Sequence, residues 1–200
     1  SMFTEWLRKV TRGIVEPIVT VLARAGIHAN TLTIIGCLLN IAVAVIIALG
    51  HIRLGGIFLI VASAFDALDG TLARRRQRPT KFGAFLDSVL DRVSEAAILL
   101  GIAWWYLHLE QPNIAGAFLA YVAIVGSTMV SYTRARGEGL GISSKVGLLT
   151  RVERCLVLIV GLVFNLVIPA LWILAVGTTV TTIHRIVDTY LKLKDDPLTS

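Results

Sequence analysis

The sequence predicts an all-α integral membrane protein with six transmembrane helices, preceded by an amphipathic juxtamembrane helix. Of the 200 residues, 56% are hydrophobic, and the mean hydropathy is +0.78. Soluble domains of this length are rarely so apolar. Apolar runs long enough to cross about 30 Å of hydrocarbon recur along the chain, separated by short polar connectors. The length fits a single domain.

Residues 1–30 are expected to form a cytoplasmic helix beside the membrane. Trp6, Leu7, Val10 and Ile14 recur at helical spacing, with basic residues between them. This pattern is typical of an amphipathic helix that lies in the membrane interface. An ordinary amphipathic helix in the cytosol is the alternative, but the spanning segments that follow directly favour the interface.

Residues 31–192 are expected to form the transmembrane catalytic domain, and residues 193–200 a cytoplasmic tail. The fifth of the apolar runs is short, so a start before Arg154 stays open for its helix. An even number of spans places both ends of the chain on one side of the membrane. The predicted spans are Thr31–Gly50, Ile52–Arg75, Phe82–His108, Asn113–Arg134, Arg154–Leu166 and Pro169–Leu191.

Lys and Arg are sorted to one side of these spans. The connectors after the second and fourth spans are rich in both, whereas the opposite side carries only Arg53. Cytoplasmic loops of membrane proteins carry this excess of positive charge. The sequence therefore predicts a multi-pass protein of the cell inner (cytoplasmic) membrane, with both termini and the active site cytoplasmic. The basic charges favour anionic membrane lipids as partners, and no nucleic-acid partner is expected.

Four aspartates occur in the stretch FDALDGTLARRRQRPTKFGAFLDSVLDR, residues 65–92. Asp66 and Asp69 are three residues apart near the end of the second span, so they share a helix face. Asp87 and Asp91, four residues apart near the start of the third span, also share a face. The chain reverses between the pairs, so all four carboxylates can meet at the inner membrane boundary. Carboxylates at this depth are costly and repel one another, and divalent cations relieve both effects; oxygen-only ligands favour Mg²⁺, Mn²⁺ or Ca²⁺.

Small residues near the aspartates leave space for a bulky ligand. Gly70, Ala73 and Gly83 expose the backbone there. Arg74 lies one turn beyond Gly70, where its guanidinium could pair with a phosphate. The alternative is a set of carboxylates that reach the interface and pair with the adjacent arginines.

The spacing of these residues resembles the signature of the CDP-alcohol phosphotransferase family. Six spans with cytoplasmic termini are also similar to this family over nearly the whole chain. The resemblance implies an enzyme that moves a phosphatidyl-type group from a CDP-linked lipid to an alcohol and releases CMP. It also implies a homodimer. All eight fixed positions are filled, as Asp66-x2-Asp69-Gly70-x2-Ala73-Arg74-x8-Gly83-x3-Asp87-x3-Asp91.

The resemblance assigns roles to individual residues. Asp91 would be the general base that accepts the proton of the acceptor hydroxyl. Two divalent cations, Mg²⁺ or Mn²⁺, would neutralise the phosphates and align the displacement. The metal ligands would be Asp66, Asp69, Asp87 and Asp91. The CDP-lipid site would comprise Asn30, Thr33, Asp66, Asp69, Gly70, Ala73, Arg74 and Gly83.

Further arginines indicate a phosphate in the acceptor alcohol. They lie in the stretch SYTRARGEGLGISSKVGLLTRVER and near the inner end of the last span, beside a site already expected to hold metal. An uncharged acceptor would need no such cluster, although anchoring to the cytoplasmic side is the alternative for any one arginine. The pattern resembles the prokaryotic branch of the family that uses inositol phosphate. The residues expected around the acceptor phosphate are Ser131, Arg134, Arg136, Arg151, Arg154 and Arg185.

The expected reaction is transfer of a phosphatidyl group from CDP-diacylglycerol to a phosphorylated polyol, with myo-inositol 3-phosphate favoured. A phosphatidylglycerophosphate synthase that uses glycerol 3-phosphate is the alternative within the family, and CDP-archaeol stays open as the donor. A divalent-cation transporter is the alternative from another class. The outer halves of the spans, such as IAVAVIIAL, are apolar, so a continuous polar pathway is not expected.

Overall fold

The computed structural model describes residues 28–75, 80–142 and 146–194, with the backbone alone for residues 66–75. The helix predicted within residues 1–30 and the tail at residues 193–200 lie almost entirely outside the described residues. In the described ranges the chain folds into helices only, which agrees with the predicted all-α class. The helices are α2 Ala29–Ala48, α3 Ile52–Arg75, α4 Lys81–Leu107, α5 Ile114–Gly139, α6 Arg151–Val163 and α7 Val167–Leu193.

Helix α5 runs further than the hydropathy pattern predicts. The predicted span ends at Arg134, whereas the helix continues to Gly139. Arg134 donates from Nε to the carboxylate of Glu138 at 2.9 Å. Ion pairs four residues apart stabilise a helix, so the polar end of α5 stays helical beyond its apolar segment.

Helix α6 begins at Arg151, before the predicted span that starts at Arg154, and this agrees with the earlier start that the short span leaves open. The carboxylate of Glu153 accepts a hydrogen bond from the backbone amide of Thr150. This bond holds the pKa of the Glu153 carboxyl below its ordinary value. An ionised glutamate in the first turn also suits the positive end of the helix dipole, so Thr150 and Glu153 define where α6 starts.

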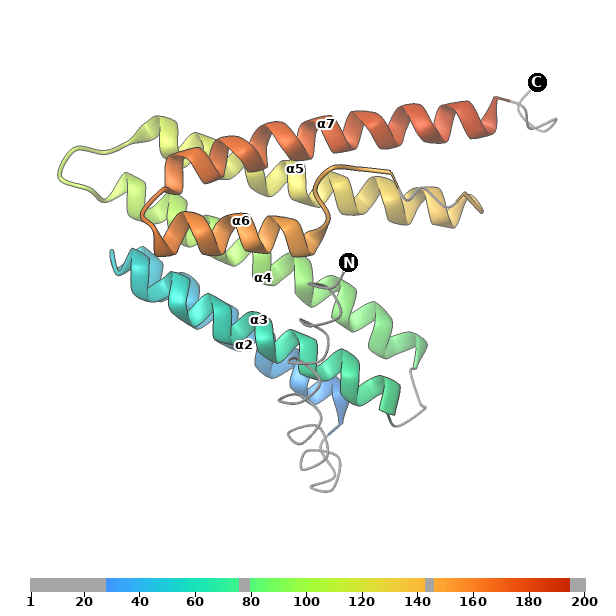
Figure 1. The fold of residues 1–200 in the computed structure, drawn as a ribbon, viewed down its shortest axis with the longest axis horizontal. Coiled ribbons are helices and arrows are strands. Elements are labelled where there is room, and N and C mark those ends of the chain that lie inside the picture. Colours follow the sequence, from blue (N-terminus) through green and yellow to red (C-terminus); the bar gives the residue numbers. More distant parts are fainter. Residues whose placement is uncertain (1–27, 76–79, 143–145, 195–200) are drawn as a thin grey trace, which may run out of the picture.

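The helices form a closed ring (Figure 1). Extensive contacts join α2 to α3 and α4, α4 to α5, α5 to α7, α7 to α6, and α6 back to α3. The order around the ring therefore differs from the order along the chain, since α2 packs between α3 and α4. The end of α3, the start of α4 and the end of α5 lie toward the same end of the bundle. That end carries the predicted site.

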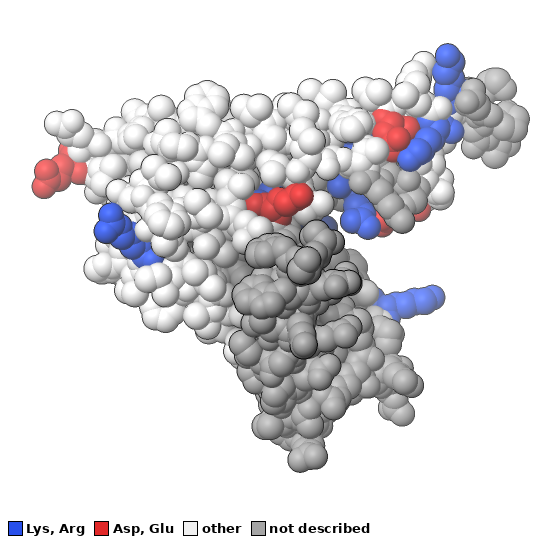
Figure 2. Space-filling view, viewed as in Figure 1, with Lys and Arg blue, Asp and Glu red and all other residues white. Residues whose placement is uncertain are grey.

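Three of the described helices, α2, α5 and α7, are long and apolar enough to cross a membrane. The first half of α4 carries several charged residues, and α6 has only 13 residues, so the count of six transmembrane helices stays a prediction. Large apolar side chains such as Leu38, Phe118 and Trp172 are exposed. Figure 2 shows a largely uncharged surface, with most of the charged side chains in this view toward the end where α7 stops. Such a surface suits contact with lipid tails.

Helices α2 and α4 approach each other closely at Gly101. A Cβ atom at this position would lie 2.4 Å from the carbonyl oxygen of Ala44. Because the neighbour is backbone, no side-chain movement could relieve that contact, and only glycine allows this approach. The contact fixes the height of α4, and thus of its aspartates, relative to α2.

Replacing Gly101 with Ala is expected to destabilise the fold by about 1–3 kcal/mol, the usual cost of overpacking a core. Thermal unfolding of the detergent-purified protein, followed by tryptophan fluorescence, should show a lower Tm. Gly139→Ala is the matched control, because nothing lies within 4 Å of a Cβ atom there. Equal Tm values for the two variants would contradict the close approach.

Candidate active site

The two acidic pairs lie on α3 and α4, between which α2 packs. Asp87 and Asp91 are one turn apart in the first half of α4, so they share a face as predicted. No group of three metal-ligating side chains is found among the described residues, and half of the predicted ligand set falls outside them. The convergence of all four carboxylates thus stays a prediction. The predicted site positions whose side chains the structure does not describe are Asp66, Asp69, Gly70, Ala73 and Arg74.

The predicted CDP-lipid residues of α2 and α4 lie side by side. Thr80 caps α4 by accepting a hydrogen bond from the Gly83 amide at 2.9 Å. A Cβ atom on Gly83 would lie 2.9 Å from Oδ1 of Asn30 and 3.0 Å from Oγ1 of Thr80. Thr33, one turn along α2, is buried and donates its hydroxyl to the Ala29 carbonyl. The structure therefore brings Asn30 and Gly83 together across the ends of two helices.

Asp91 contacts one of the arginines predicted for the acceptor. Its Oδ1 lies 2.8 Å from Nη2 of Arg151, the first residue of α6. The Asp91 side chain is 13% exposed and that of Arg151 39%. The ion pair crosses the ring from α4 to α6, so it joins the predicted base to the predicted acceptor region.

A second ion pair lies one turn deeper, and the sequence analysis missed its acidic member. Glu95 on α4 accepts from both Nε and Nη2 of Arg154 on α6, at 2.6 and 2.8 Å. The side chains are only 11% and 3% exposed, respectively. Glu95 lies four residues after Asp91 and thus on the same helix face. This spacing could have indicated Glu95 as a member of the site.

The remaining predicted arginines are distributed around the end of α5. Arg185 is buried on α7 and donates to the backbone carbonyls of Val130 and Val146. Arg134 lies one turn after Val130 on α5, and Arg154 donates to Leu149 in the same segment as Val146, so these three predicted residues, the arginine cluster, surround one segment. Arg136 is exposed, two residues from Arg134, and so belongs to another face of the helix. Ser131 is half-buried beside Val130 in the chain.

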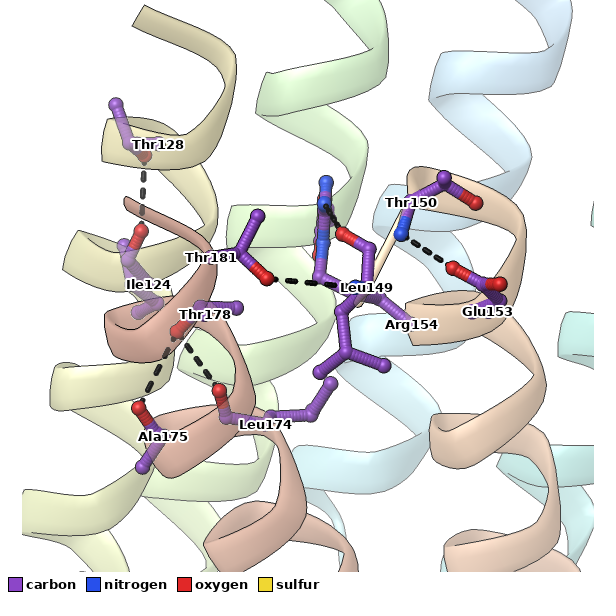
Figure 3. A network of polar contacts seen from close by, with 11 residues as sticks. Ile124, Thr128, Leu149, Thr150, Glu153, Arg154, Leu174, Ala175, Thr178 and Thr181 are labelled. Carbon is purple, nitrogen blue, oxygen red and sulfur yellow. Dashed lines mark hydrogen bonds and ion pairs between the residues drawn. The ribbon is translucent and has the colours of Figure 1, made fainter. Parts of the chain in front are cut away.

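The segment before α6 is held through its backbone (Figure 3). The amides of Leu148 and Leu149 donate to the hydroxyl oxygen of Thr181 at 3.2 and 3.4 Å. The Leu149 carbonyl accepts from Nη1 of Arg154 at 3.2 Å. Thr181 is buried on α7 and was not predicted. These bonds fix the start of α6, and with it Arg151.

A recess extends into the bundle beside the Asp91–Arg151 pair. Its free volume is about 30 Å³. Asn40 of α2, Ser63 of α3 and Glu95 of α4 contribute polar atoms to its wall. Sites for small ligands are concave and carry a few polar groups among apolar ones. The recess therefore places a small space with a partly polar wall next to Asp91.

Comparison with known proteins identifies the family. The model of the CDP-alcohol phosphatidyltransferase family matches residues 26–184. A phosphatidylinositol phosphate synthase from Corynebacterium glutamicum is 35% identical over 187 residues, covering 90% of this chain and 85% of the relative. An archaetidylinositol phosphate synthase from Pyrococcus horikoshii is 35% identical over 189 residues, covering 94% of this chain and 97% of the relative.

Solved structures show the same fold. The crystal structure of Mycobacterium tuberculosis phosphatidylinositol phosphate synthase (PgsA1) with CDP-DAG bound has a TM-score of 0.83 at 28% identity, and the match covers 88% of this chain and 94% of that one. The structure of PgsA1 in complex with manganese and citrate has a TM-score of 0.81 at 30% identity, covering 88% and 89%. The chain therefore belongs to the CDP-alcohol phosphatidyltransferase family and is a transferase of phospholipid biosynthesis.

Proposed function

We propose that this enzyme transfers the phosphatidyl group of CDP-diacylglycerol to a hydroxyl of myo-inositol 3-phosphate, giving phosphatidylinositol phosphate and CMP. The observation that carries the proposal is that Arg154 and Arg185 both donate to the segment before α6, whose first residue, Arg151, pairs with Asp91. Guanidiniums bind phosphate oxygens through paired hydrogen bonds, so a phosphorylated acceptor fits the arginine cluster. The name of the Corynebacterium relative supports the same acceptor.

The donor is supported by two observations. PgsA1 has been solved with CDP-DAG bound, and Asn30 and Gly83 lie together here where the nucleotide is expected. The name of the Pyrococcus relative points to an archaetidyl product. The experiment below therefore compares CDP-diacylglycerol with CDP-archaeol as well as the acceptors.

The carboxylate oxygens predicted to bind metal suit divalent cations. Oxygen-only sites suit Mg²⁺ and Mn²⁺, Asp87 and Asp91 share a face of α4, and Asp91 already meets a positive charge from Arg151. A PgsA1 structure holds manganese. A pair of cations would supply neutralisation of the donor pyrophosphate and of the charge that grows on leaving CMP. The residues proposed to hold the pair are Asp66, Asp69, Asp87 and Asp91.

The chain's own residues would carry out the transfer as follows. The acceptor phosphate lies against the arginine cluster, which directs a polyol hydroxyl toward the donor. Asp91 takes the hydroxyl proton, and the oxygen attacks the phosphorus that bears the lipid. A new phosphorus–oxygen bond forms as the pyrophosphate bond breaks, and CMP leaves. Arg151 orients the Asp91 carboxylate through the 2.8 Å contact.

A competition between acceptors tests the proposal. Purified enzyme receives CDP-diacylglycerol or CDP-archaeol with equal concentrations of myo-inositol 3-phosphate, glycerol 3-phosphate, free inositol and serine. The inositol phosphate product should exceed each of the others by about tenfold or more, because a site built for a polar group rejects analogues that lack it. A dominant glycerol product would instead identify a phosphatidylglycerophosphate synthase. Absence of CMP release with every acceptor would overturn the proposal.

The arrangement in the membrane is also proposed. Each chain would cross the cytoplasmic membrane with six helices within residues 31–192, and two chains would form a homodimer. The arginine cluster would face the cytoplasm. The charge asymmetry supports this orientation. A membrane-impermeant thiol reagent applied to intact cells should label Glu110→Cys but not Glu138→Cys in a protein whose native cysteines are replaced.

A further inference from the structure

The buried ion pair between Glu95 and Arg154 calls for a functional explanation. Both side chains are almost wholly enclosed, and Glu95 is the last charged residue of α4 before its apolar half. Taking two charges out of water costs about as much as their attraction returns, so apolar replacements of buried pairs are often neutral or stabilising. Stability alone therefore gives little reason for this pair.

The pair does not use all the N–H donors of the Arg154 guanidinium. A guanidinium has five N–H donors. Glu95 takes one from Nε and one from Nη2, and the Leu149 carbonyl takes one from Nη1. One N–H remains on each Nη nitrogen, and the described residues provide no further acceptor for them. Two such donors can bind an oxyanion in the paired manner that guanidiniums use for phosphate.

Because Arg154 is enclosed, the orientation of its guanidinium decides whether a ligand can bind to it. With a side chain only 3% exposed, Arg154 cannot swing out to meet a ligand, so the remaining donors must be aimed before the ligand arrives. Two oxygens of Glu95 bind the guanidinium at once, which fixes the plane of the group as well as its position. An unrestrained arginine side chain loses rotamer entropy when it binds a ligand, and this arrangement removes that loss from the binding step.

The same contact ties the arginine cluster to the predicted base. Glu95 and Asp91 share a face of α4, and Arg154 and Arg151 lie three residues apart on α6. Two ion pairs one above the other thus connect the two helices across the ring. The distance between an anion on Arg154 and the carboxylate of Asp91 therefore depends on Glu95.

We infer that Glu95 is a positioning residue for the acceptor: its carboxylate holds Arg154 so that the remaining N–H donors face the acceptor phosphate. The inference rests on the proposed function, because it takes the acceptor to be a phosphate ester. It assigns to Glu95 no contact with the substrate itself.

The test compares Glu95→Gln with Glu95→Asp and with Glu110→Gln, a matched loss of an exposed carboxylate in the connector between α4 and α5. Calorimetry measures binding of myo-inositol 3-phosphate and of inorganic phosphate to the purified protein without donor. Glu95→Gln should weaken both by about tenfold to a hundredfold, as expected for a lost charge-assisted hydrogen bond. The acceptor KM should rise in parallel while the donor KM stays nearly constant. Glu95→Asp should recover part of the loss, and Glu110→Gln should behave as wild type.

A second background separates positioning from a general structural role. In an Arg154→Gln protein, adding Glu95→Gln should cause little further loss of phosphate binding, because the positioned group is already gone. Unchanged phosphate binding in Glu95→Gln, or equal rises in donor and acceptor KM, would overturn the inference. So would failure of both Glu95 variants to fold, which would make the pair a stability element. If the wild type shows phosphate binding that depends on Glu95 but prefers another phosphorylated acceptor, the proposed function fails and the inference holds.

Discussion

Asn in place of Asp91 is expected to lower kcat by about 10²- to 10⁴-fold, the usual contribution of a general base, while CDP-diacylglycerol still binds. The amide has the shape of the carboxylate and can still accept a hydrogen bond from Arg151, but it cannot take the proton of the acceptor hydroxyl. The Arg151 side chain is 39% exposed, so water can solvate its charge when the ion pair is lost. The variant should therefore fold. Single-turnover release of CMP measures the chemical step, and calorimetry measures donor binding.

Two comparisons make the Asp91 result specific. The pH–rate profile of the wild type should have an acidic limb that is absent from the Asn variant, since the group that must lose a proton is gone. Glu110→Gln controls for the loss of one carboxylate far from the site. A rate above one tenth of wild type in Asp91→Asn would remove Asp91 from the role of base.

Removal of divalent cations by EDTA is expected to reduce CMP release to the background rate, and Mg²⁺ or Mn²⁺ should restore it. The physical reason is charge: four proposed carboxylate ligands and the donor pyrophosphate repel one another unless cations lie between them. Mn²⁺ binding, followed by the electron paramagnetic resonance signal of the free ion, gives a readout that does not depend on turnover. Asp87→Asn should weaken that binding, and Glu110→Gln should not. Full activity in chelator-treated enzyme would show that the acidic end of the bundle works without metal.

Apolar runs predicted every described helix, because spans in lipid must satisfy their backbone hydrogen bonds internally and must present apolar side chains. The ends were less predictable. Helix α6 starts at Arg151 because Thr150 and Glu153 form the Thr-x-x-Glu pattern of a helix start, a signal that hydropathy does not contain. Helix α5 reaches Gly139 because the Arg134–Glu138 pair continues it.

The candidate site was predictable to the extent that its residues are close in sequence. Fixed spacing placed Asp87 and Asp91 on one face of α4, and the structure agrees. Glu95 was not predicted because its partner Arg154 is 59 residues away in the sequence. Helical periodicity shows which residues share a face of α4, but it does not show which residues of another helix pack against that face. Thr181 was missed for the same reason, since its hydroxyl meets backbone amides of a segment 32 and 33 residues earlier.

The ring order of the helices has a consequence for biogenesis. Synthesis proceeds from the N-terminus, so α2 to α5 are complete before α6 and α7 exist. In that half-made protein α3 still lacks its neighbour α6, and neither Arg151 nor Arg154 has met its carboxylate partner. The last two helices must therefore pack against helices made earlier, and both ion pairs between α4 and α6 form only then.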